Sequence, residues 1–123
     1  MEKRIIGKGP KGLPFSAGVL AGDTFYLSGS IGFDEKENKL IEGGIEAETR
    51  KAIENLESVL KEARMDLWNV VKVTAYLADM RDYEKFNSVY RKYFADHLPA
   101  RETVAVSGLA LEAKIELSFI AVR

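Results

Sequence analysis

The stretch that decides the fold is Lys114-Ile115-Glu116-Leu117-Ser118-Phe119-Ile120-Ala121-Val122, which has the character of a β-strand. Apolar residues stand at both alternating sets of positions in it, and residues 70–78 combine the same pattern with many β-branched side chains. Strands of this kind are buried on both faces of a sheet, whereas a half-buried strand alternates polar and apolar residues. We therefore expect residues 70–78 and 114–122 to be strands that are buried on both faces.

Helical and extended patterns surround these two strands. Residues 45–64 repeat apolar side chains at helical spacing, and Asp82 stands where it could cap a second helix over 82–96. The dipeptide Gly22-Asp23 predicts a hairpin turn, and the glycines and prolines of residues 7–16 predict a loop. The other expected strands are residues 3–6, 17–21, 24–28 and 102–107, with a brief pairing segment at 39–41.

This order of elements predicts an α+β fold with a mixed, mostly antiparallel sheet and both helices on one face. The chain has no internal repeat and no linker, which favours a single domain over residues 1–123. Two helices cannot cover both faces of a sheet in which two strands are apolar at both sets of positions. We therefore expect a closed homo-oligomer in which the sheets of the subunits face inward.

The composition disfavours several classes of function. Eighteen basic and 19 acidic side chains give a net charge of -1, which disfavours a nucleic-acid partner. The absence of cysteine excludes thiolate chemistry, and a single histidine, His97, disfavours a metal centre or a Ser-His-Asp triad. Residues 1–7 lack a signal-peptide pattern and no apolar run reaches membrane length, so we expect a cytoplasmic protein.

Two charged residues stand where chemistry could take place. Arg101 opens the strand that follows Pro99, and its planar fork of donors suits two-point contact with a carboxylate. Glu116 is set into an otherwise apolar strand, where burial would raise the pKa of an acid/base group. The pair suggests a site that binds a small carboxylic acid and moves protons beside it. The alternatives are a surface ion pair for Arg101 and a structural ion pair for Glu116, including one between the two residues.

The sequence resembles the Rid (reactive intermediate deaminase) family over nearly its whole length. Each matching motif is weak alone, but their order and spacing are specific. The motifs are Phe25-Tyr26-Leu27-Ser28-Gly29, Glu46-Ala47-Glu48-Thr49-Arg50, Val71-Lys72-Val73-Thr74-Ala75-Tyr76-Leu77, Phe86-Asn87-Ser88-Val89-Tyr90, Pro99-Ala100-Arg101 and Lys114-Ile115-Glu116.

The resemblance implies a chorismate-mutase-like fold and a homotrimer with active sites in clefts between subunits. It further implies that Arg101 binds the substrate carboxylate, that Glu116 helps activate water, and that Thr103 contributes its backbone carbonyl. It also places Ser28 and Gly29 at the substrate, together with Asn87 of the second helix.

Three positions depart from the pattern of many deaminating members of the family. Phe15 stands where those members have tyrosine, Thr103 where they have cysteine, and Ser30 where they have glutamine. Thr103 loses nothing if only its carbonyl acts, but Phe15 lacks a hydroxyl that could orient water or substrate. Phe15 therefore leaves the substrate range open.

The activity that the resemblance implies is hydrolysis of 2-iminopropanoate, 2-iminobutanoate and their enamine tautomers to 2-keto acids and ammonia. This reaction clears reactive intermediates, a form of metabolite damage control, and requires no metal or cofactor. Two alternatives remain at this point. One is a non-catalytic module that binds a small carboxylate or a partner protein, and the other is an endoribonuclease or translation inhibitor.

Overall fold

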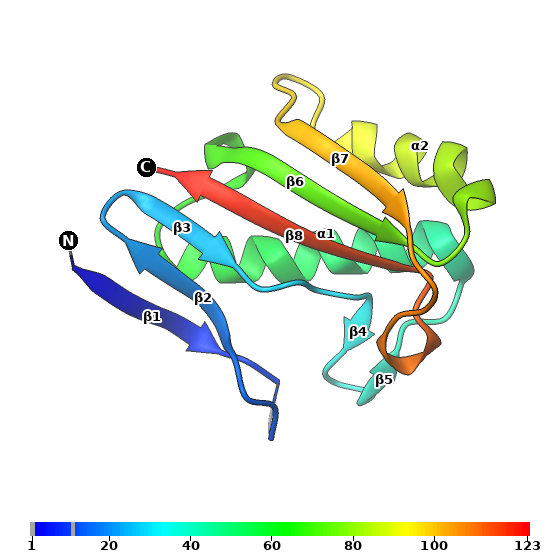
Figure 1. Ribbon diagram of the computed structural model, residues 1–123, viewed down its shortest axis with the longest axis horizontal. Coiled ribbons are helices and arrows are strands. Elements are labelled where there is room, and N and C mark those ends of the chain that lie inside the picture. Colours follow the sequence, from blue (N-terminus) through cyan, green and yellow to red (C-terminus); the bar gives the residue numbers. More distant parts are fainter. Residues whose placement is uncertain (1, 11) are drawn as a thin grey trace.

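A computed structural model describes residues 2–10 and 12–123 (Figure 1). Met1, and Lys11 within the expected loop, lie outside the described residues. The two α-helices of the described part are α1 (Gly44–Glu62) and α2 (Tyr83–Tyr93). The strands are β1 (Lys3–Lys8), β2 (Ser16–Ala21), β3 (Thr24–Leu27), β4 (Phe33–Asp34), β5 (Lys39–Leu40), β6 (Val70–Leu77), β7 (Ala100–Ala105) and β8 (Ile115–Val122).

The expected α+β fold is confirmed, and β6 and β8 are central strands. The main sheet has six strands in the order β1-β2-β3-β8-β6-β7, and β4 and β5 form a separate pair. Every neighbouring pair in the main sheet is antiparallel except β6 and β7, which run parallel because α2 connects them as a crossover. The sheet is therefore mixed and mostly antiparallel.

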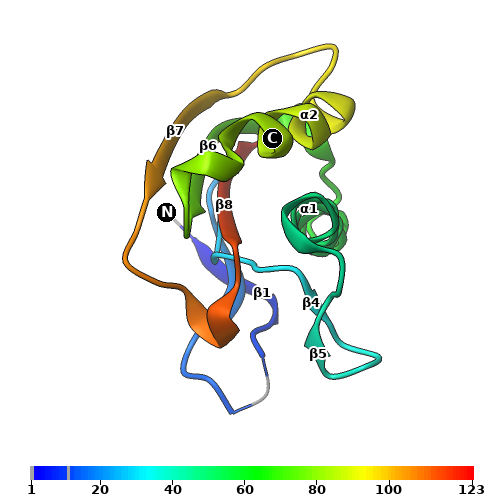
Figure 2. The same cartoon turned by 90° about the vertical axis from the view of Figure 1, so that its right-hand side faces the viewer.

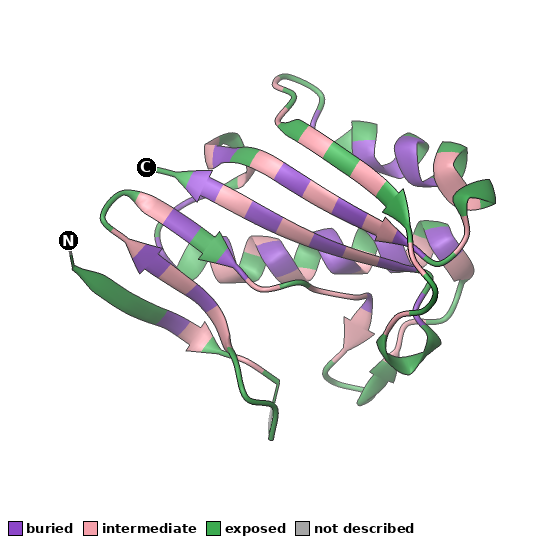
Figure 3. Cartoon of the chain, viewed as in Figure 1, coloured by how far each residue is buried: buried purple, intermediate pink, exposed green. Residues whose placement is uncertain are grey.

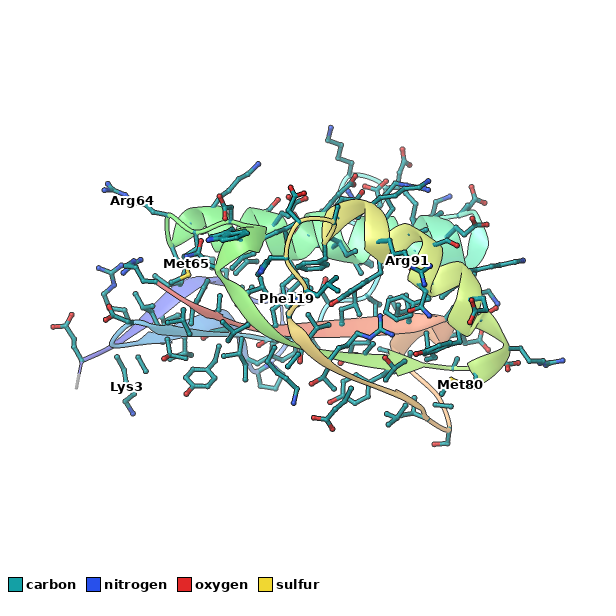
Figure 4. The ribbon with its side chains drawn as sticks, turned by 90° about the horizontal axis from the view of Figure 1, so that it is seen from above. Lys3, Arg64, Met65, Met80, Arg91 and Phe119 are labelled. Atoms are coloured by element: carbon teal, nitrogen blue, oxygen red, sulfur yellow. The ribbon has the colours of Figure 1, made fainter. Side chains whose placement is uncertain are left out.

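Both helices cover the same face of the sheet, as Figure 2 shows. The core lies between the two layers, where Phe119 projects from β8 toward the helices (Figure 4). The inward side chains of α1 include Ile53, Leu56 and Leu60, each at most 1% exposed, which confirms the helical spacing in the sequence. None of the helices in the described residues is long and apolar enough to cross a membrane.

The local boundaries differ from the expected ones for identifiable reasons. The helix α1 ends two residues early, because Arg64 adopts a left-handed conformation with φ of 58° and its N–H bonds to the carbonyl of Lys61. Asp82 precedes α2 but makes no side-chain cap, so the expected cap is wrong. Asp79 provides one instead, since its carboxylate accepts the N–H of Arg81 in the preceding 3₁₀ turn.

No helix formed by the described residues covers the other face of the sheet, and we call it the open face. Burial alternates along β6 and β8 (Figure 3), with Val73, Ala75, Leu117 and Phe119 fully buried under the helices. The intervening residues on the open face are only partly buried. On this face lie Lys72, Thr74 and Tyr76 of β6, Glu116, Ser118 and Ile120 of β8, and Val104 of β7.

Candidate functional site

The sheet places Arg101 and Glu116 on opposite faces. Arg101 is paired in register with Val73, whose side chain is buried under the helices, so the arginine points toward the helix layer. Glu116 is paired with Tyr76 and points to the open face. No ion pair joins the two residues in the described chain, so the alternative of a structural ion pair between them within one chain is not observed. Each belongs to a separate half of the candidate site.

The helix-side half is built around the guanidinium of Arg101, which is partly buried beside α2. Its Cζ atom lies 5.7 Å from the ring centroid of Tyr83, 4.9 Å from that of Phe86 and 4.7 Å from that of Tyr90. These are cation–π distances, and we call the three rings the aromatic cage. Nη2 donates a hydrogen bond of 3.2 Å to the Tyr83 hydroxyl. No carboxylate of the described residues pairs with the guanidinium, so most of its donors are free for a ligand.

Other polar groups in the seam between α2 and β7 also lack partners. The hydroxyl oxygens of Tyr90 and Thr103 are buried and make no hydrogen bond with the rest of the described chain. Burial raises the pKa of Tyr90 to about 12, so its hydroxyl stays a neutral donor. Asn87 of α2 is 9% exposed, but no described contact places its side chain in this seam. Buried polar groups without partners are rare in folded proteins, and they mark this seam as a place where a polar ligand or water is bound.

The open-face half is built around the partly buried carboxylate of Glu116. Gly29 lies directly against it, because a Cβ atom at position 29 would stand 2.9 Å from the Glu116 Cδ atom. Burial raises the pKa of the Glu116 carboxyl above its usual range, and no described residue donates a hydrogen bond or a charge to it. A carboxylate with a raised pKa and no fixed partner is a suitable proton acceptor for a bound water molecule.

Backbone pairing explains why Gly29 reaches Glu116. The N–H and C=O groups of Ser30 exchange hydrogen bonds of 2.8 and 2.9 Å with those of Leu117, which holds the segment after β3 against β8. The hydroxyl of Ser28 donates to the carbonyl of Ser16 at 2.6 Å, so this side chain secures β3 to β2 and is not free. Phe15 is 46% exposed just before β2, and no interaction joins it to Arg101 or Glu116.

Two features of the structure, one at the candidate site and one that supports the sheet, were not predicted from the sequence. The aromatic residues that line one side of the second helix at helical spacing predict core packing; they are Tyr83, Phe86, Tyr90, Tyr93 and Phe94. Phe86 is indeed fully buried, but Tyr83 and Tyr90 also surround Arg101. The hydroxyl groups of Tyr83 and Tyr90 were the one feature of the sequence that could have indicated a role beyond packing, since phenylalanine would suffice for packing. Glu48 is the second case, because it is 3% exposed and accepts the N–H of Lys114 at 2.7 Å, which fixes the start of β8.

Known proteins share this sequence and fold over nearly the whole chain. The family model described as endoribonuclease L-PSP matches residues 10–123. A human 2-iminobutanoate/2-iminopropanoate deaminase is 37% identical over 124 residues, covering 98% of this chain and 90% of that protein. A RutC family protein of Saccharolobus solfataricus is 44% identical over 115 residues, covering 93% of this chain and 91% of that protein. The structure of E. coli TdcF with bound serine has a TM-score of 0.89 at 28% identity, covering 98% of each chain.

These matches agree with the motifs found in the sequence. The family model covers far more than half of the chain, and the human relative aligns over nearly its full length. The chain therefore belongs to the endoribonuclease L-PSP family, which is the Rid family that its motifs indicate.

Proposed function

We propose that this protein is an enamine/imine deaminase that hydrolyses 2-iminopropanoate and 2-iminobutanoate to 2-keto acids and ammonia in the cytoplasm. The observation that carries the proposal is the guanidinium of Arg101, which is held among three rings and has no carboxylate partner in the described chain. A small 2-imino acid supplies the missing carboxylate. Relatives of similar length named as imine deaminases support this substrate class.

The proposed reaction needs one anchored anion and one base. Arg101 binds the substrate carboxylate in two-point contact, and Glu116 accepts a proton from water as the oxygen attacks the imine carbon. The imine nitrogen gains the proton, and the resulting carbinolamine releases ammonia and leaves the 2-keto acid. The backbone of Thr103 and Gly29 lies beside these groups, while Phe15, Ser28 and Asn87 line the cleft in this proposal.

The two halves of the site require more than one chain, because Arg101 and Glu116 face opposite sides of the sheet. We propose a homotrimer with chorismate-mutase-like packing, in which the helix-side half of one subunit meets the open-face half of the next. The open face supports this arrangement, since Tyr26 and Val104 remain 51% and 44% exposed on a single chain. Light scattering that shows a monomer at micromolar concentration would rule the trimer out.

The activity is tested with imines generated freshly from several amino acids and compared in one series. We expect faster loss of the imines of alanine and 2-aminobutyrate than in buffer alone, without added metal or cofactor. The same preparation is incubated with RNA. Cleavage of RNA without imine hydrolysis would favour an endoribonuclease, and binding of 2-ketobutyrate without turnover would favour a non-catalytic module.

If each cleft is shared between two subunits, oligomers that mix two inactive variants should regain part of the activity. Co-expression of Arg101→Lys and Glu116→Gln subunits, each with its own tag, gives trimers in which about one cleft in four combines an intact Arg101 with an intact Glu116. Trimers purified through both tags contain both kinds of subunit, and one of their three clefts is intact, so we expect them to recover about a third of the parent activity, although each variant alone is nearly inactive. If both residues act within one chain, the mixed trimers will be no more active than the two variants.

A further inference from the structure

The hydrogen bond between Arg101 and Tyr83 restricts how the guanidinium can receive a ligand. Nη2 of Arg101 donates to the Tyr83 hydroxyl at 3.2 Å, on the side of the arginine that faces α2. A guanidinium offers a carboxylate two edges for two-point contact, one formed by Nη1 and Nη2 and the other by Nε and Nη2. Each edge uses one of the two hydrogens on Nη2. When Tyr83 accepts one of these hydrogens, a single edge remains complete.

We propose that Tyr83 is a positioning residue that selects which edge of the Arg101 guanidinium binds the substrate carboxylate. The proposal rests on the function proposed above, because it assigns how the same site orients its 2-imino acid. It concerns the Tyr83 hydroxyl, which residue spacing alone does not distinguish from the other aromatic residues on the inner side of α2.

The aromatic cage keeps the selected edge in place. The rings of Phe86 and Tyr90 lie 4.9 and 4.7 Å from Cζ of Arg101, so the planar group is flanked by aromatic surfaces. These rings hold the position of the guanidinium but do not distinguish its two edges, because neither provides it with a hydrogen-bond acceptor in the structure. The Tyr83 hydroxyl makes that distinction, since it is the one protein acceptor bonded to the guanidinium among the described residues.

The selected edge determines where the reacting carbon lies. In a 2-imino acid the imine carbon is bonded directly to the carboxylate, so changing the edge moves the carbon relative to the base that activates water. A shift of about 1 Å in a reacting atom can lower a rate strongly. Loss of the Tyr83 hydroxyl should therefore reduce turnover more than it reduces binding, because a freed second edge still holds the carboxylate.

The kinetic test compares Tyr83→Phe with Tyr93→Phe. Tyr93 lies on the same helix, but Arg101 does not contact its ring, and its hydroxyl is near Glu54 of α1. For Tyr83→Phe we expect kcat to fall about 10-fold, with a change of about 2-fold at most in KM and in the Kd for 2-ketobutyrate. Tyr93→Phe should match the parent in all three. Unchanged kcat in Tyr83→Phe, or an equal loss in both variants, would overturn the proposal.

A spectroscopic measurement tests the restraint without turnover. In a ¹H–¹⁵N spectrum of arginine side chains, the Arg101 signals are identified by their loss in Arg101→Lys. We expect slowed rotation of the guanidinium in the parent and faster rotation in Tyr83→Phe, with no change in Tyr93→Phe. Equal rotation in the parent and Tyr83→Phe would overturn the selection role even if imine hydrolysis is confirmed. If the parent neither hydrolyses imines nor binds 2-ketobutyrate, the proposed function fails and the selection of an edge fails with it, whatever the rotation shows.

Discussion

Replacing Glu116 by glutamine is expected to slow imine hydrolysis by about 100-fold or more, because an amide cannot accept the proton of the attacking water. Binding of 2-ketobutyrate should stay close to that of the parent, since Arg101 lies on the other face of its own sheet and keeps all its donors. The measurements are the imine hydrolysis rate and the Kd for 2-ketobutyrate by calorimetry.

The pH profile provides a second readout for Glu116. Burial raises the pKa of this carboxyl, so the group is protonated over a wider acidic range than an exposed glutamate. The parent kcat/KM should therefore fall as the pH decreases through a pKa above the usual carboxyl range, and the residual activity of Glu116→Gln should lack this step. The rates are corrected for the uncatalysed hydrolysis at each pH.

Glu102→Gln is the matched control for Glu116→Gln. Glu102 is also a carboxylate on the open face, but it is exposed and pairs with Lys72 at 2.5 Å. Because exposed ion pairs contribute little to stability, this variant should hydrolyse imines at the parent rate. Unimpaired turnover in Glu116→Gln would exclude a catalytic role. A joint loss of ligand binding and thermal stability in that variant would instead indicate a structural partner.

Replacing Arg101 by lysine is expected to raise the Kd for 2-ketobutyrate roughly 10- to 100-fold, with a corresponding fall in kcat/KM. Lysine keeps the positive charge but presents a point charge in place of a planar fork, so two-point contact with the carboxylate is lost. The hydrogen bond from Nη2 to Tyr83 is lost as well. Calorimetry and imine hydrolysis measure both effects, and light scattering checks that the oligomer is unchanged.

Arg91→Lys is the control for this substitution. Arg91 is an exposed arginine on α2 that makes no ion pair in the described chain, and Figure 4 shows it at the surface of the helix layer. The control variant should bind 2-ketobutyrate and hydrolyse imines as the parent does. If Arg101→Lys also matches the parent, Arg101 has only a structural or peripheral role.

The sequence supported the architecture because its strongest patterns are local. The helical spacing within residues 45–64 predicted α1, and the double apolar pattern of residues 70–78 and 114–122 predicted two strands, which the structure places side by side in the main sheet. Boundaries were less predictable where several caps compete. Asp79 and Asp82 are both plausible caps by residue type, and only the backbone path after β6 makes Asp79 the one that accepts an N–H.

Residue chemistry identified candidate groups but not their relative placement. The planar fork of Arg101 and the lone carboxylate of Glu116 are visible as residue types in a chain without cysteine and with one histidine. The face on which each side chain lies depends on the register of β7 with β6 and of β8 with β6. That register comes from pairing between segments far apart in the chain, and a shift of one residue moves every side chain to the other face.

The sequence by itself determined the α+β class, the strands at residues 70–78 and 114–122 and the presence of a sheet face that two helices leave uncovered, because hydrophobic periodicity records which surfaces must leave water. Only the tertiary structure decided that Arg101 and Glu116 lie on opposite faces and that Tyr83, Phe86 and Tyr90 surround the arginine. These contacts join α2 to β7, two elements brought together by the parallel pairing of β7 with β6. Periodicity is a property of each segment alone, whereas a contact between segments exists only once both are packed on the same sheet.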